Sequence, residues 1–179
     1  MLNIKRFICN PIQENTYIIY DESKEAVIVD CGAFYPEEKQ AIKEYIDQEG
    51  LTVRHLLLTH DHFDHTFGNV FIQENYGLEP EGYGKKEISF GTHRFEVIPT
   101  PGHNPDAVVF YCKEEKLALT GDTLFKGSIG RTDMEGGSYD DILKSLQYLK
   151  EILPDDTQLL PGHGDHTFMD DEKRTNPYL

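Results

Sequence analysis

The sequence has 179 residues and a formal net charge of −15, since 17 Lys and Arg stand against 32 Asp and Glu. A chain of this length is typical of one domain and buries about 70% of its unfolded surface, so it needs no disulfide scaffold. The acidic balance argues against binding to a nucleic-acid backbone or to an anionic membrane, because both require clustered cations. Hydrophobic residues make up 38% of the chain and form strand-like runs, which argues against disorder.

Cysteine usage and the first residues favour a reducing compartment. No apolar run reaches the length of a membrane span, and residues 1–5 do not begin like a secretory signal. The three cysteines, Cys9, Cys31 and Cys112, are odd in number and widely spaced, so we expect no disulfide framework. We predict that they are small buried side chains and that the protein is cytoplasmic.

Strands dominate the first thirty residues, and a helix follows them. Apolar runs predict three strands, over residues 4–9, 16–20 and 26–29, with a hairpin turn between the second and the third. Pro36 marks the start of a helix, and Gly50 marks its end.

Four later apolar runs each lead through a short turn to a His or an Asp. Residues 56–59 lead to His60, residues 95–98 to His103, residues 117–121 to Asp122, and residues 157–160 to His163. The carboxyl ends of neighbouring strands in layered α/β folds share one rim, where ligands usually bind. We therefore expect these four side chains to lie close together.

A second amphipathic helix completes the predicted elements. It begins at Ser138, whose spacing to Asp141 fits a capping box, and it stops at Pro154. No stretch of the sequence is typical of a linker, a repeat or a low-complexity segment. Short strands with two or three helices predict an α/β fold in which residues 1–179 form a single domain.

The densest polar motif, H-x-H-x-D-H, runs from His60 to His65. Imidazoles two residues apart in a tight loop can converge on one cation, and Asp64 and His65 can turn toward a second. With the three donors from the other strand ends, seven side chains are available for two metal ions. A polar loop with hydrogen-bonded histidines is the alternative reading, and a closed structural zinc site would be richer in cysteine.

The motifs of this sequence resemble those of the metallo-β-lactamase superfamily, and within it the hydroxyacylglutathione hydrolase (glyoxalase II)-like group. The matching segments cover nearly the whole chain: His60–His65, Thr100–His103, Gly121–Phe125, Gly127–Asp133, Pro161–Gly164 and Asn176–Leu179. The resemblance implies a four-layer αββα sandwich with the metal ions at one edge. The metal-binding motifs are highly specific to the superfamily, but they indicate the substrate much less specifically.

The resemblance also implies a ligand set. His60, His62 and His103 would hold the first metal ion, and Asp64, His65 and His163 the second, with Asp122 bridging the two. The cofactors would be two divalent metal ions, with zinc expected and iron or manganese as alternatives.

The implied reaction is hydrolysis of a thioester or ester, of the S-acylglutathione type, by a metal-bridging hydroxide. Asp64 and Asp122 would be the catalytic carboxylates, with Asp64 orienting the hydroxide or carrying a proton. A thiolate leaves readily, so the reaction needs no strong general acid.

Two departures from the glyoxalase II pattern concern the substrate. Only 38 positions separate His65 from His103, and residues 76–88 replace a longer helix-and-loop segment, so we expect an open cleft. We also expect no counterpart of the C-terminal helical extension that binds glutathione in full-length glyoxalase II, which puts glutathione specificity in doubt.

Four residues are candidates for supporting the metal ligands or contacting substrate. Asp30 matches a position that buttresses the metal site in the family, and His166 lies close in sequence to His163. Arg131 follows a glycine-rich loop and could pair with a substrate carboxylate, or with Asp133 to fix the loop. Tyr83 could contact substrate. For His55 and His93, which lie in strand-like runs, we predict structural or surface roles.

Three other functions stay open. A mononuclear iron persulfide dioxygenase would share much of this pattern and would hold one iron through His60, His103 and Asp122. A redirected metallohydrolase would act on a β-lactam, lactone or phosphoester. A metal-binding module without turnover is the nonenzymatic alternative. The partner expected in each enzymatic case is a small-molecule substrate.

Overall fold

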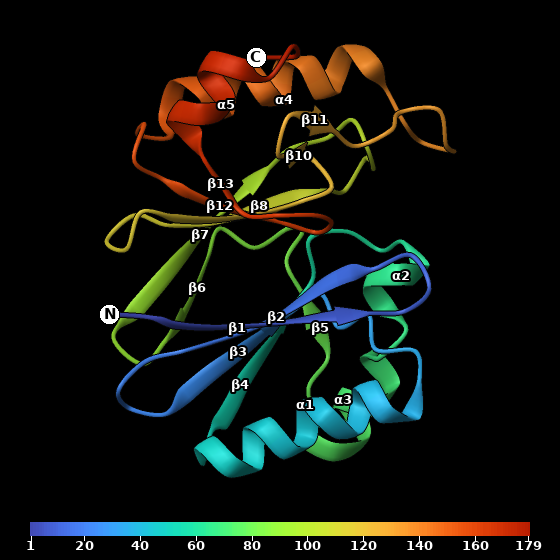
Figure 1. Ribbon diagram of the computed structural model, residues 1–179, viewed down its shortest axis with the longest axis vertical. Coiled ribbons are helices and arrows are strands. Elements are labelled where there is room, and N and C mark those ends of the chain that lie inside the picture. The colour runs from blue at the N-terminus through green and yellow to red at the C-terminus, as the bar shows by residue number, and fades with distance from the viewer.

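The computed structural model describes residues 1–179 as two facing β-sheets with helices on both outer sides (Figure 1). The first sheet has the order β1-β2-β3-β4-β5 and is antiparallel up to β3 and parallel beyond it. Its strands are β1 (Asn3–Cys9), β2 (Glu14–Tyr20), β3 (Glu25–Val29), β4 (Thr52–Leu57) and β5 (Pro80–Glu81). Figure 1 shows α1 (Pro36–Glu49) and α3 (Asn69–Tyr76) below this sheet.

The second sheet has the order β13-β12-β9-β8-β7-β6, and only its β9–β12 pair is parallel. Its strands are β6 (Glu87–Phe90), β7 (His93–Pro99), β8 (Val108–Cys112), β9 (Leu117–Gly121), β12 (Gln158–Pro161) and β13 (Thr167–Phe168). Figure 1 shows α4 (Tyr139–Ile152) and α5 (Met169–Thr175) above it. A small hairpin, β10 (Leu124–Phe125) and β11 (Ser128–Ile129), and a one-turn helix, α2 (Phe63–Thr66), complete the structure.

Strand β2 shows how the sequence builds these layers. Side chains alternate across a strand, and every residue of β2 is buried. Tyr17 and Ile19 point into the core between the two sheets, whereas Ile18 and Tyr20 point into the core between the first sheet and α1. A third core lies between the second sheet and α4. The predicted αββα sandwich is therefore confirmed.

The predicted helix boundaries agree with their capping residues. Pro36 lies in the first turn of α1, and Gly50 ends the helix with a φ of +64°, which glycine adopts without strain. Ser138 caps α4 by accepting a hydrogen bond from the Asp141 amide at 3.3 Å. The strands near the N-terminus also form as predicted. The segment over residues 76–88, predicted as a turn-rich bridge, contains the short strand β5.

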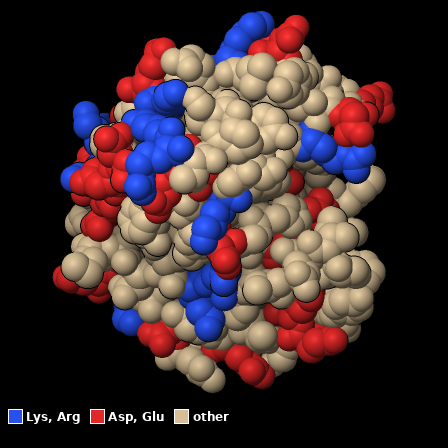
Figure 2. Space-filling view, turned by 45° about the horizontal axis from the view of Figure 1, so that its top comes forward, with Lys and Arg blue, Asp and Glu red and all other residues tan.

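Several short elements were not predicted, namely α2, α3, α5 and the strands β6, β8, β10, β11 and β13. The longest helices have 14 residues, and none is long and apolar enough to span a bilayer. All three cysteines are buried and free, as predicted. On the face that Figure 2 shows, Lys and Arg side chains lie beside Asp and Glu side chains, with uncharged surface between these groups.

Candidate metal centre

The predicted metal-binding side chains all lie at one edge of the sandwich. The loop after β4 carries His60 and His62, and α2 directly after it carries Asp64 and His65. The second sheet contributes the other three, from the turns after β7, β9 and β12: His103, Asp122 and His163. The two sheets therefore meet at a shared polar edge, as the four strand ends predicted.

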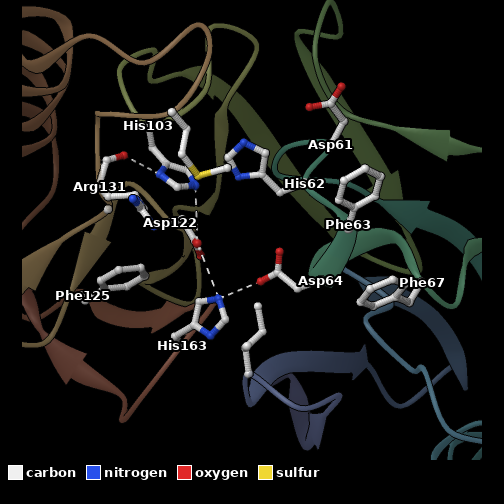
Figure 3. A pocket seen from close by; sticks show the side chains of 13 residues that line it. Asp61, His62, Phe63, Asp64, Phe67, His103, Asp122, Phe125, Arg131 and His163 are labelled. Carbon is white, nitrogen blue, oxygen red and sulfur yellow. Dashed lines mark hydrogen bonds and ion pairs between the residues drawn. The ribbon is translucent and has the colours of Figure 1, made fainter.

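The donor atoms form two adjacent groups. His60, His62 and His103 make up one group, and Asp64, His65, Asp122 and His163 make up the other, with the donor atoms of each lying within 4.8 Å of one another. Figure 3 shows the members of both groups that line the pocket pointing toward a common centre.

Asp122 lies between the two groups. Its Oδ2 is 3.9 Å from His60 Nε2 and 3.5 Å from His103 Nε2. On the other side, Oδ1 is 3.2 Å from His65 Nε2, and Oδ2 is 3.5 Å from His163 Nε2. Its carboxylate can therefore serve both groups, which is the position that a bridging ligand needs.

Hydrogen bonds to the Nδ1 atoms fix the orientation of three imidazoles. His103 Nδ1 donates to the Arg131 carbonyl at 2.7 Å, and His65 Nδ1 donates to Asp30 Oδ2 at 2.9 Å. Thr59 donates its hydroxyl hydrogen to Asp30, so its oxygen accepts from His60 Nδ1 at 3.0 Å. Since Nδ1 holds the proton in each ring, the Nε2 lone pair is free to bind a cation.

Buried atoms without partners support a metal site. The Nε2 atoms of His60, His65 and His103 and the Oδ1 atom of Asp122 are buried and have no hydrogen-bond partner. Such atoms are costly in a folded protein unless another group satisfies them. Imidazole and carboxylate donors are those that zinc, iron and manganese accept, so the residues present fit a divalent metal centre.

The pKa shifts of the histidines in the centre also fit a metal site. Burial lowers the pKa of His60 well below its usual value, so this ring is neutral and able to ligate. Burial also opposes protonation of His163, but the Asp122 and Asp64 carboxylates outweigh it and raise the pKa of His163 to about 10. Without cations the centre therefore retains protons, which bound metal ions would displace.

Asp30 accepts hydrogen bonds from a residue of the histidine motif and from the neighbouring Thr59, which fits the supporting position that the family resemblance implied. Its buried carboxylate accepts hydrogen bonds from the Thr59 amide at 2.7 Å and from His65. It therefore connects the start of the histidine motif to one of its donor rings.

The other three suggested residues take different positions. The Arg131 guanidinium pairs with Asp133 through two bonds of 2.6 and 2.8 Å, as in the second of the two roles considered for it. Tyr83 lines a separate pocket of about 300 Å³. The His166 ring lies 5.7 Å from that of Tyr17, outside both donor groups, and burial lowers its pKa.

Both remaining histidines have the structural roles that we predicted for them. His55 bonds to Glu81, while His93 lies between Asp21 and Glu115.

Sequence reasoning missed the residues that hold the His163 loop. The backbone N–H of Asn15 donates to the Gly162 carbonyl at 2.7 Å. The side-chain amide of Asn15 donates to the Pro161 and Gly164 carbonyls at 3.0 and 2.9 Å. Glu14, fully buried beside it, lies 3.9 Å from His65 Nδ1. The available signal was a run of three polar residues, Glu14, Asn15 and Thr16, directly before the apolar part of β2.

A pocket of about 680 Å³ opens over the donors. Its lining combines polar groups of the centre with apolar side chains from several segments: Ile12, Asp61, His62, Phe63, Asp64, Phe67, His103, Asp122, Phe125, Gly130, Arg131, Met134 and His163. Its volume is typical of sites for small molecules.

Comparison with known proteins identifies the family. The sequence model of the metallo-β-lactamase superfamily matches residues 9–85 and 78–163, and the chain belongs to this superfamily. It is 30% identical over 212 residues to the hydroxyacylglutathione hydrolase GloC of Haemophilus influenzae, covering 99% of this chain and 98% of that protein.

Two solved structures share the fold over almost their whole length. The BLEG-1 B3 metallo-β-lactamase has a TM-score of 0.90 and 30% identity, with 99% of each chain covered. TTHA1623 in a di-iron-bound form has a TM-score of 0.86 and 28% identity, with 98% of this chain and 100% of that chain covered. The class is therefore that of metal-dependent hydrolases, and the relatives named include both a hydroxyacylglutathione hydrolase and a β-lactamase.

Proposed function

We propose that this chain is a dinuclear metal-dependent hydrolase that cleaves a thioester or ester. The observation that carries the proposal is the pair of adjacent donor groups, with Asp122 in one group and facing the other, at the base of a pocket large enough for a small molecule. The similarity to GloC, a hydroxyacylglutathione hydrolase, supports a thioester as the scissile group.

The ligand assignment follows the two groups. His60, His62 and His103 would hold one cation, and Asp64, His65 and His163 the other, with Asp122 shared. Two such cations supply Lewis acidity, lower the pKa of a bound water and stabilise developing negative charge on the substrate oxygen. We propose zinc, because imidazole with carboxylate is an ordinary zinc donor set, with iron as the alternative that di-iron TTHA1623 supports.

Asp64 is suited to orienting water rather than to acting as an acid. Burial favours its neutral form, but hydrogen bonds with His163 and His65 outweigh burial and hold the pKa of Asp64 well below its usual range. Its Oδ2 lies 3.0 Å from His163 Nε2. It therefore stays a carboxylate at neutral pH, which suits a substrate whose thiolate leaves without protonation.

The test combines a metal count with turnover. Metal-loaded protein is assayed on thioesters, lactones, β-lactams and phosphodiesters, and His62→Ala and Asp122→Ala are expected to abolish hydrolysis while the circular dichroism spectrum is retained. His55→Ala, which removes a histidine outside the centre, is the matched control and keeps full turnover. Full activity in either ligand variant would defeat the assignment.

Hydrolysis of a β-lactam is a second candidate, favoured by the match of the BLEG-1 structure over 99% of both chains. The same substrate panel separates the two functions. One iron per chain with sulfite production from a persulfide would instead identify a dioxygenase.

A further inference from the structure

We infer that the pocket binds a substrate whose acyl group is apolar and whose leaving group bears no carboxylate. This inference rests on the proposed hydrolase function and specifies its substrate class. It follows from two features of the pocket, its apolar wall and its charge.

The apolar wall is assembled from four separate segments. Ile12 comes from the β1–β2 turn, Phe63 and Phe67 from α2 and its end, Phe125 from β10, and Met134 from the loop before α4. Figure 3 shows Phe63 and Phe67 on one side of the polar donors and Phe125 on the other. Phe63 is 81% exposed and Ile12 is 62% exposed. Large apolar side chains exposed together mark a binding surface.

The apolar wall and the donor side chains line one pocket, and this indicates which part of a substrate lies against the wall. The same pocket is lined by the wall and by His62, Asp64, His103, Asp122 and His163. A chain lying against the wall therefore places an attached carbonyl group beside the donors. The wall is also supported from behind, because the Phe67 ring packs edge-on against the Phe34 ring at 4.9 Å.

The charge of the pocket disfavours carboxylates on the leaving group. Arg131 is the one Lys or Arg that lines it, and the guanidinium is already paired bidentately with Asp133. Asp61, exposed at the rim, accepts a hydrogen bond from Asn104 Nδ2 at 2.8 Å and forms no ion pair. The carboxylates of a glutathione group would therefore find no unpaired Lys or Arg side chain in the lining and would meet the negative charge of Asp61.

The expected magnitude comes from hydrophobic transfer. Each methylene buried against the wall should raise kcat/KM about fourfold, which gives on the order of 250-fold for the four methylenes between an acetyl and a hexanoyl group. Metal-loaded protein is assayed on S-acetyl-, S-butanoyl- and S-hexanoyl-N-acetylcysteamine and on S-hexanoylglutathione. We expect kcat/KM to rise along the neutral series and to be lower for the glutathione thioester than for its neutral counterpart.

Substitutions in the apolar wall test whether its side chains determine the preference for long acyl groups. Phe63→Ala and Met134→Ala should each lower the hexanoyl-to-acetyl ratio of kcat/KM about tenfold, and two variants from separate segments guard against a local folding defect. Tyr148→Ala removes an aromatic ring that is 51% exposed on α4, outside the pocket, and should leave the ratio unchanged. Asp61→Asn should raise the glutathione-to-neutral ratio several-fold, less so at high salt. A flat chain-length dependence, or a preference for the glutathione thioester, overturns the inference.

A binding measurement separates this inference from the proposed function. The ketone analogue of S-hexanoyl-N-acetylcysteamine, with a methylene in place of sulfur, is titrated into metal-free protein by calorimetry. We expect binding with a negative heat-capacity change that weakens in Phe63→Ala. Binding of the analogue without hydrolysis of any thioester would refute the proposed thioester hydrolysis and support the proposed binding of an apolar acyl group. Hydrolysis without chain-length preference would refute the apolar pocket and leave the hydrolase standing.

Discussion

The Asp30→Asn substitution tests whether the Asp30 carboxylate fixes the tautomer of His65, one of the proposed metal ligands. Asp30 is 2% exposed, and its Oδ2 accepts from the Thr59 hydroxyl at 2.6 Å and from His65 Nδ1 at 2.9 Å. The backbone φ of Asp30 is +51°, a conformation that Asn also tolerates. Asn therefore fits the same space, and the substitution changes the chemistry while the shape is kept.

The new amide should move a proton on His65. Asn can still accept from the Thr59 amide through Oδ1, but its NH₂ group would then face His65 Nδ1. The ring must accept there, so its proton moves to Nε2 and the lone pair that would bind metal is lost. Loss of such a partner lowers metal affinity by about 10- to 100-fold, or ~1.4–2.7 kcal/mol. Asp30→Ala should also destabilise the fold, because it leaves three buried donors without an acceptor. Each such donor lowers the free energy of unfolding by about 1–3 kcal/mol.

Metal content by mass spectrometry and competition with a chelator measure the affinity, and urea unfolding of metal-free protein measures the stability. We expect Asp30→Asn to lose metal and to stay more stable than Asp30→Ala. Asp21→Asn is the matched control, because Asp21 also accepts from a histidine, His93, at 3.2 Å but lies outside both donor groups. Wild-type metal affinity in Asp30→Asn, or equal loss in Asp21→Asn, would refute the reasoning.

Three further predictions concern other parts of the molecule. Gly162→Ala should abolish most turnover and lower the metal count, because a Cβ there would collide with Asp122 and His65. Burial raises the pKa of Cys9 to about 12, so the native thiols should resist a thiol reagent that labels all three after denaturation. Burial tends to raise the pKa of Asp21, but hydrogen bonds from Ser23 and Thr92 outweigh it and hold the pKa below its usual range. Wild type should therefore be more stable than Asp21→Asn above about pH 4, with the difference shrinking in urea titrations as the pH falls below it.

The strands and the donors could be predicted because their signals are local. Runs of apolar residues bounded by turn residues give β2 and β3, and Ser138 with its spacing to Asp141 gives the start of α4. The histidine motif carries its donors within six positions, so chain connectivity alone keeps them together. Their roles as ligands stay a prediction that the metal count tests.

The remaining features depend on tertiary contacts that leave no local trace. The partner of His103 is the backbone carbonyl of Arg131, and any residue type supplies a carbonyl. The apolar wall draws one or two side chains from each of four segments, and none of these side chains stands out in its own stretch of sequence. One-turn helices such as α2 are too short for a hydrophobic period to show.

The contact between Asn15 and the Pro161 carbonyl spans 146 positions, so the His163 loop takes its shape from a strand near the beginning of the chain. Contacts of such separation form late, because much of the chain must be closed into a loop first. During synthesis the histidine motif therefore leaves the ribosome long before its last partner. A nascent chain stalled before residue 161 lacks both His163 and the carbonyls that Asn15 holds, so it carries six of the seven donors and can complete only the group of His60, His62 and His103.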